Sequence, residues 1–88
     1  MRFEWDEEKF QRNISKHGID FHRANSLFFV DHVTFELESE PEKRWAIIGR
    51  IDDKFYTGIY TKRGSKIRWI SVRRSRVNEE KYFENYFY

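Results

Sequence analysis

The first third of the chain places apolar side chains at helical intervals. Phe10, Ile14 and His17 fall at positions i, i+4 and i+7, which lie on one stripe of a helix. Gly18 follows directly and can end a helix in the left-handed conformation that glycine adopts without strain. The pattern predicts a helix from about Glu7 to His17.

Two further elements flank this helix. Asp6 has a side-chain oxygen that can cap its first turn, and Phe3 to Trp5 can form a short edge strand before it. Asp20 can cap a second helix. Its apolar residues again recur at helical spacing, namely Phe21, Ala24, Leu27 and Phe28. We therefore expect two helices ahead of the long strands.

From Val33 onward the pattern changes to short runs of β-branched and aromatic residues separated by turn residues. Four runs predict four strands, at Val33 to Glu38, Arg44 to Ile51, Phe55 to Tyr60 and Lys66 to Arg74. The connections are short enough to join antiparallel neighbours, so a four-stranded antiparallel meander is the simplest topology.

The last segment predicts one more helix. Ser75 or Asn78 can cap it, and its apolar flank consists of aromatic residues, namely Tyr82, Phe83, Tyr86 and Phe87. No repeat, low-complexity tract or linker divides the sequence. We expect residues 1–88 to form one α+β domain with two N-terminal helices, a meander sheet and a C-terminal helix.

The composition limits the compartment and the cofactors. The chain has no Cys, which excludes disulfides and thiolate metal sites, and its three His lack the close helical spacing of a zinc pair. We expect no metal and no cofactor. No stretch approaches the roughly 20 apolar residues of a membrane span, and acids stand at the N-terminus where a signal peptide needs an apolar run. These features predict a cytoplasmic protein with no membrane partner.

Charge is distributed unevenly along the chain. Residues 1–44 hold 7 Lys or Arg against 10 Asp or Glu, whereas residues 45–88 hold 10 against 5. From Lys62 to Arg76 there are seven cations and no acid. Such a segment favours a polyanionic partner, because local positive potential attracts phosphates. The alternative is a solvated strand edge, where Lys and Arg prevent aggregation.

The last predicted strand carries several arginines. Side chains alternate across a strand, so Arg68 and Arg74 are expected on one face, and Trp69 and Arg73 on the other. Arginine suits phosphate because its planar fork donates two parallel hydrogen bonds. Three aromatic residues can either stack on unpaired bases or pack in the core, namely Tyr56, Tyr60 and Trp69. We expect Trp69 in the core and leave both tyrosines open.

His17 closes the first predicted helix. An imidazole at that place can carry a proton near neutral pH. The ordinary alternative is that His17 packs beside Phe10 and Ile14, or interacts with the negative end of the helix dipole.

Short motifs spread over nearly the whole chain resemble those of the BrnT family. In the first half they are Phe3-Glu4-Trp5-Asp6, then Asn13 with Lys16-His17-Gly18-Ile19, then Phe21 and Ala24 with Phe28. In the second half they are Gly49-Arg50, Tyr60-Thr61-Lys62-Arg63-Gly64 and Arg68-Trp69-Ile70-Ser71-Val72-Arg73-Arg74. The resemblance implies a toxin of a type II toxin-antitoxin system with a fold like that of the RelE ribonucleases. It also implies a hetero-oligomer with a small DNA-binding antitoxin, BrnA.

These observations lead to the hypothesis of metal-free RNA cleavage. The substrate's own 2′-hydroxyl attacks the adjacent phosphate, so the protein supplies only proton carriers and cations. The candidate catalytic residues are His17, Tyr60, Arg63, Arg68, Arg73 and Arg74. The candidate RNA contacts are Lys16, Arg50, Lys62, Lys66 and Arg76. Two alternatives stay open: a non-catalytic RNA-binding module, and a protein-protein interaction module in which the aromatic last helix contacts a partner.

Overall fold

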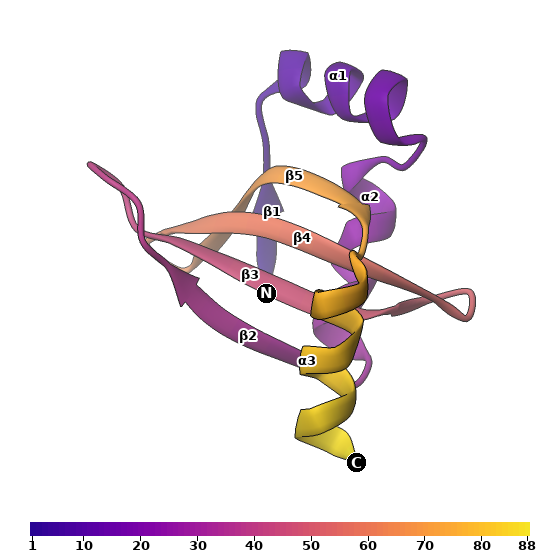
Figure 1. Cartoon of the computed structure of the whole chain (residues 1–88). Coiled ribbons are helices and arrows are strands. Elements are labelled where there is room, and N and C mark those ends of the chain that lie inside the picture. The colour runs from indigo at the N-terminus through magenta and orange to yellow at the C-terminus, as the bar shows by residue number, and fades with distance from the viewer.

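The structure, a computed structural model that describes residues 1–88, has α+β architecture (Figure 1). Three α-helices, one 3-10 helix and five strands follow one another along the chain. They are β1 (Arg2–Glu4), α1 (Glu7–His17), α2 (Phe21–Ala24), η1 (Asn25–Phe29), β2 (His32–Leu37), β3 (Arg44–Ile51), β4 (Lys54–Arg63), β5 (Lys66–Arg74) and α3 (Val77–Phe87). None of the helices is long and apolar enough to cross a membrane.

The sheet has five strands in the order β1-β5-β4-β3-β2. Strands β2 to β5 form the predicted antiparallel meander, but β1 pairs in parallel with β5, opposing Phe3 to Ile67. The predicted four-stranded meander and the short N-terminal edge strand are therefore both present, but the parallel edge strand makes the sheet mixed. Strand β1 is held in place by Phe3, whose ring packs on Phe28 and Trp69. The backbone of β1 covers the first three residues of the most basic strand, β5, whereas the rest of β5 has no strand on that side.

Local signals decided where the first two helices begin. Asp6 accepts a hydrogen bond from the backbone N–H of Glu8 at 2.8 Å, and Gly18 ends α1 with a φ of 71°. Asp20 caps the next helix, as predicted. The predicted second helix is present, but it has only four α-helical residues, and the chain continues through Leu27 and Phe28 as the 3-10 helix η1.

The last two elements also differ from expectation. Helix α3 begins one residue after Arg76, whose backbone N–H donates to the Glu79 side chain at 2.8 Å, so neither Ser75 nor Asn78 is the cap. Strand β4 continues to Arg63, through residues predicted as a turn, because the ladder with β5 extends to the pair Arg63 and Lys66.

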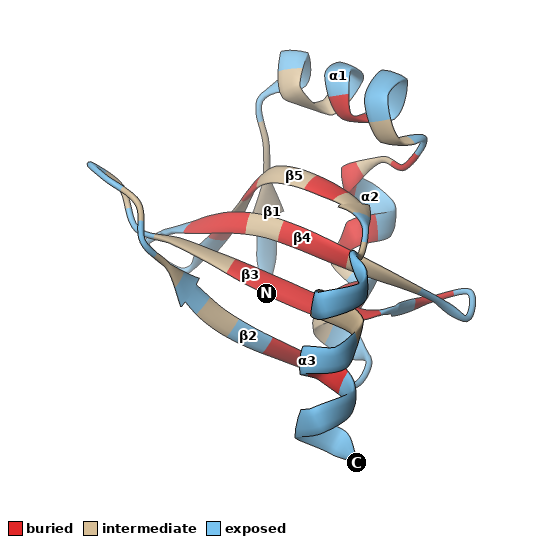
Figure 2. Ribbon diagram, viewed as in Figure 1, coloured by how far each residue is buried: buried red, intermediate tan, exposed pale blue.

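Apolar residues pack on both faces of the sheet. On one face, which we call the α2 face, the cluster includes Phe21, Leu27, Tyr60, Trp69 and Val72. On the other, the α3 face, Phe83 packs against Val33 and Ile48. Figure 2 shows buried residues along the three inner strands, β3, β4 and β5. Trp69 is 1% exposed and donates its indole N–H to Asn25, which confirms it as a core residue.

A β-bulge in β5 changes which residues share a face. Ile59 of β4 opposes Ser71, but the next residue, Tyr60, opposes Trp69, so Ile70 is an extra residue in the strand. The predicted alternation is wrong beyond this point, because an extra residue shifts every following side chain to the opposite face. Trp69 and Val72 both lie in the core of the α2 face. Arg68, Ser71 and Arg73 consequently lie together on the α3 face, and Arg74 on the α2 face.

Candidate functional site

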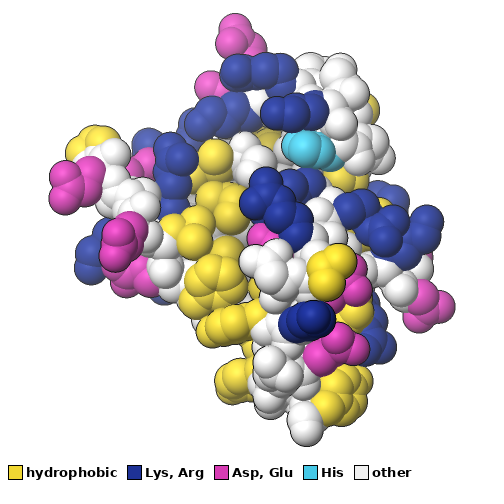
Figure 3. Space-filling model, viewed as in Figure 1, with side chains coloured by type: hydrophobic (Ala, Val, Ile, Leu, Met, Phe, Trp, Pro, Cys, Tyr) yellow, Lys and Arg dark blue, Asp and Glu magenta, His cyan; other side chains and the backbone are white.

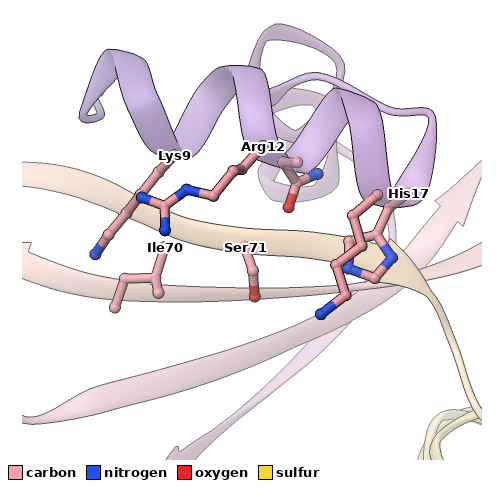
Figure 4. Close-up of a pocket in the computed structure, with 7 residues that line it drawn as sticks. Lys9, Arg12, His17, Ile70 and Ser71 are labelled. Atoms are coloured by element: carbon pink, nitrogen blue, oxygen red, sulfur yellow. The ribbon is translucent and has the colours of Figure 1, made fainter.

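A basic groove lies between helix α1 and strand β5 (Figure 4). Its volume is about 210 Å³, and we call it the α1–β5 groove. It is lined by Lys9, Arg12, Asn13, Lys16, His17, Ile70 and Ser71. In Figure 4, Lys9 and Arg12 reach from the helix across β5, and Ile70 and Ser71 both project from the bulge on the side of the groove. The bulge therefore contributes both β5 residues of the groove.

Asn13 holds α1 against β5. Its side-chain N–H groups donate to the backbone oxygens of Ile19 and Val72, each at 2.8 Å, and its oxygen accepts from the Val72 N–H at 3.0 Å. Asn13 is 5% exposed. Strand β1 pairs with β5 only as far as Arg68, so the Asn13 amide takes the place of a neighbouring strand further along. These bonds determine the distance between the basic side of α1 and the floor of the groove.

His17 lies at one end of the groove in Figure 4 and is partly buried. Burial lowers its pKa, and the positive charges of Lys16 and Arg73 lower it further. The sign follows from the chemistry, since burial and neighbouring cations both disfavour the imidazolium form. The imidazole is therefore neutral over a wider pH range than that of a free histidine and is able to accept a proton.

Arg73 reaches the same region from β5 and is held by Glu79 of α3. Its two terminal nitrogens donate to the two carboxylate oxygens at 2.7 Å each. Glu79 also accepts from the hydroxyl of Thr57 at 3.1 Å and from the Arg76 backbone. Although burial alone would raise the pKa of Glu79, the hydrogen bonds from Arg73 and Arg76 lower it to about 2. The carboxylate is charged, and it also raises the pKa of Arg73 through their hydrogen bonds.

Other predicted cations of β5 and its turn are paired with acids at the far end of the strand. Arg68 donates to Glu4 of β1 at 2.5 Å, and Lys66 lies 3.7 Å from the same carboxylate. Arg63 lies 3.3 Å from Glu42. Hydrogen bonding from Arg68 lowers the pKa of Glu4. Arg68 shares the α3 face with Arg73. None of Arg63, Lys66 and Arg68 lines the groove.

Several other predicted residues lie away from the groove. Tyr60 is 3% exposed in the core, and burial raises its pKa, so its hydroxyl is unavailable to a surface substrate. Arg74 lies on the opposite face from Arg73, 5.7 Å from the ring of Tyr56. Further cations contact aromatic rings or solvent, namely Arg50 over Phe55, Lys62 over Trp45 and the exposed Arg76. The structure thus brings together His17, Lys16 and Arg73, and it does not gather the other arginines around them.

Sequence reasoning missed Lys9 and Arg12. Both line the groove with Lys16, at positions i, i+3 and i+7 of α1. The signal was present in that spacing, which places all three on one helix face. The net negative charge of residues 1–44 drew attention away from this spacing, because a net charge does not show which helix face a cation occupies. No group of three or more His, Asp or Glu side chains converges in a way that could hold a metal ion.

Comparison with known proteins identifies relatives of this chain. Residues 5–79 match the model of a family described as the ribonuclease toxin, BrnT, of type II toxin-antitoxin systems. Among solved structures, the chain is similar to the 1.1 Å crystal structure of the Brucella abortus ribonuclease toxin BrnT, with a TM-score of 0.74 and 32% sequence identity. That match covers 86% of this chain and 97% of the Brucella chain. No curated protein sequence matches.

Proposed function

Because the chain belongs to the BrnT family of type II toxin-antitoxin ribonuclease toxins, we propose that it is an endoribonuclease that cuts RNA in the α1–β5 groove without a metal ion. The observation that carries the proposal is the meeting of a neutral imidazole, His17, with two cations, Lys16 and Arg73, beside a groove on the surface. A proton acceptor and positive charge are what phosphodiester cleavage by an internal 2′-hydroxyl requires.

In the proposed reaction His17 accepts the proton of the 2′-hydroxyl. The 2′-oxygen forms a bond to the adjacent phosphorus, the bond from phosphorus to the 5′-oxygen breaks, and the leaving oxygen takes a proton from water. The products are a 2′,3′-cyclic phosphate and a free 5′-hydroxyl. Lys16 and Arg73 stabilise the negative charge that accumulates on the phosphate oxygens. Glu79 occupies one edge of the Arg73 guanidinium, which leaves its Nε–H and one Nη2–H for the phosphate.

Two other predicted cations, Arg68 and Lys66, lie away from the proposed cleavage site. Arg68 lies on the α3 face with Arg73, and we assign it and Lys66 to contacts with RNA beyond the cut. Tyr60 has no proposed proton-transfer role because its hydroxyl is in the core. The likeness to the RelE ribonucleases stays a prediction of the family resemblance.

A type II system pairs its toxin with a protein antitoxin. We propose that the antitoxin of this chain is of the BrnA type, a small DNA-binding protein that forms a hetero-oligomer with the toxin. An acidic or amphipathic segment that covers the α1–β5 groove would inhibit cleavage, because the groove cations would then contact carboxylates instead of phosphates.

The direct test is digestion of RNA in EDTA by the purified chain and by two histidine variants. We expect cleavage to persist in EDTA, to leave 2′,3′-cyclic phosphate ends, and to fall about 10²- to 10⁴-fold in His17→Gln, as loss of a general base does. His22→Gln is the matched control, because His22 is exposed on α2 and contacts Trp5 instead of the groove. Cleavage that stops in EDTA and returns with Mg²⁺ contradicts the proposal. RNA that is bound but never shortened favours the non-catalytic alternative.

A further inference from the structure

Helix α1 presents a row of cations along the groove. Lys9, Arg12 and Lys16 lie on one helix face, and at about 1.5 Å per residue they span roughly 10 Å of the axis. Figure 3 shows Lys and Arg side chains following α1 across the top of the view. Cations placed one turn apart are able to contact successive phosphates of a strand that runs along the helix.

These three cations are free of acidic partners. None of them forms an ion pair, whereas Arg68 and Arg73 are each bonded to a carboxylate. A phosphate that approaches α1 therefore meets uncompensated charge and displaces no protein carboxylate. This contrast separates the α1 row from Arg68 and Arg73 of β5, each of which an acid already holds.

The floor beneath the row is partly apolar, with Ile70 as the one hydrophobic residue that lines the groove. Ile70 projects from the bulge toward the groove, and Ile59 of β4 opposes Ser71 on the same face. Figure 3 shows hydrophobic side chains below the row of cations. The groove, at about 210 Å³, is smaller than the roughly 300 to 1,000 Å³ of pockets that enclose a small molecule. A surface of this shape suits bases lying side by side on an open floor, while their phosphates lie against the helix.

The row has defined ends. His17 lies at its C-terminal end, and Glu7 and Glu8 occupy the first turn of α1 beyond Lys9. These two carboxylates repel phosphate, so the row accommodates about three phosphates, one for each cation.

We propose that α1 is a backbone track for single-stranded RNA. Lys9, Arg12 and Lys16 bind three consecutive phosphates, the one at Lys16 being the linkage that is cut beside His17, and the bases rest on Ile70 and Ile59. This inference rests on the proposed function, since it names the form of RNA that the site takes. A duplex does not fit this arrangement, because its bases are stacked inside and only phosphates and groove edges face the protein.

The test measures binding of a fluorescent 2′-O-methyl RNA oligonucleotide, which lacks the attacking hydroxyl, by anisotropy over a series of salt concentrations. Each contact with a single-strand phosphate contributes about 0.7 to the slope of log affinity against log salt. We expect Lys9→Gln, Arg12→Gln and Lys16→Gln each to reduce the slope by about 0.7, and the triple variant by about 2. Lys54→Gln is the matched control, because Lys54 is exposed at the start of β4 and leaves the slope unchanged.

Two results would overturn the track. One is a triple variant whose salt slope equals that of the Lys54→Gln control. The other is equal affinity for the same oligonucleotide annealed to its complement. Cleavage of the unmodified strand is followed in parallel, so that the two proposals are separated: slopes that respond without cleavage support the track alone, and cleavage with unresponsive slopes rejects the track alone.

Discussion

Arg73 of β5 donates two hydrogen bonds of 2.7 Å to Glu79 in the first turn of α3. The pair joins the sheet to the last helix at the point where β5 ends, and it keeps the guanidinium close enough to His17 to lower the pKa of the imidazole. The arginine is therefore shared between the fold and the proposed site. Its charge acts on the groove while its position depends on α3.

The first prediction concerns the stability of this connection. Glu79→Gln removes the charge that compensates Arg73, and we expect it to lower the free energy of unfolding by about 1.5–3 kcal/mol, the range for hydrogen bonds to charged groups. Urea denaturation measures the change. Glu80→Gln, at the next residue and without an ion pair, is the control and should cost no more than about 0.5 kcal/mol. Equal losses in both variants would show that Arg73 and Glu79 contribute nothing specific.

The second prediction is the pH dependence of the same pair. The pKa of Glu79 is about 2 in the folded chain, below its ordinary value of 4.5, so the unfolded chain binds this proton more readily. The stabilisation is thus complete above about pH 4.5 and is lost as the pH falls toward 2. We expect the stability difference between the unmodified chain and Glu79→Gln to shrink through that window in acid titrations. A difference that stays constant from pH 5 to 2 would contradict the assignment.

The third prediction concerns His17. Burial, Lys16 and Arg73 all lower its pKa, so replacing Lys16 with Gln removes one cation and should raise that pKa. NMR titration of the His17 ring measures it directly. In the cleavage assay, activity should fall as the pH drops below the His17 pKa, and in Lys16→Gln this fall should begin at higher pH. An unchanged titration of His17 in Lys16→Gln, matching that in Lys54→Gln, would show that Lys16 does not act on the imidazole.

The fourth prediction concerns the contact that positions α1. Asn13→Ala leaves the buried N–H and carbonyl of Val72 without their side-chain partner, and we expect a loss of about 2–4 kcal/mol in the free energy of unfolding. Denaturation measures the loss, and amide exchange at Val72 should accelerate. Gln11→Ala is the control, because the exposed Gln11 side chain bonds only to Glu7. If both variants unfold alike, α1 is held by its apolar contacts instead.

Much of the backbone plan followed from local patterns. The bounds of α1 were predictable because Asp6 and Gly18 are strong signals for a helix start and end. The meander of β2 to β5 was predictable because short connections join antiparallel neighbours. The parallel pairing of β1 was not, because Arg2–Glu4 is too short to show a period, and its partner lies more than sixty residues away.

The candidate site was predicted only in part, for the same physical reason. His17, Lys16 and Arg73 were named from residue type and position; the structure places His17 and Lys16 in one groove and Arg73 close enough for its charge to act on His17. Arg68 was misplaced relative to Arg73 and Arg74, because a one-residue bulge at Ile70 reverses the faces of the residues that follow it. No feature of the sequence predicts the bulge at Ile70.

The amino-acid sequence by itself determined the order of the elements, the family and the concentration of positive charge in the second half of the chain. Tertiary structure alone decided which cations are free. Carboxylates of other elements, Glu4 of β1 and Glu79 of α3, pair with Arg68 and Arg73 of β5, whereas Lys9, Arg12 and Lys16 of α1 have no such partner. Charge along a chain depends on residue type, but the field at a surface depends on which opposite charges folding places within a few ångströms.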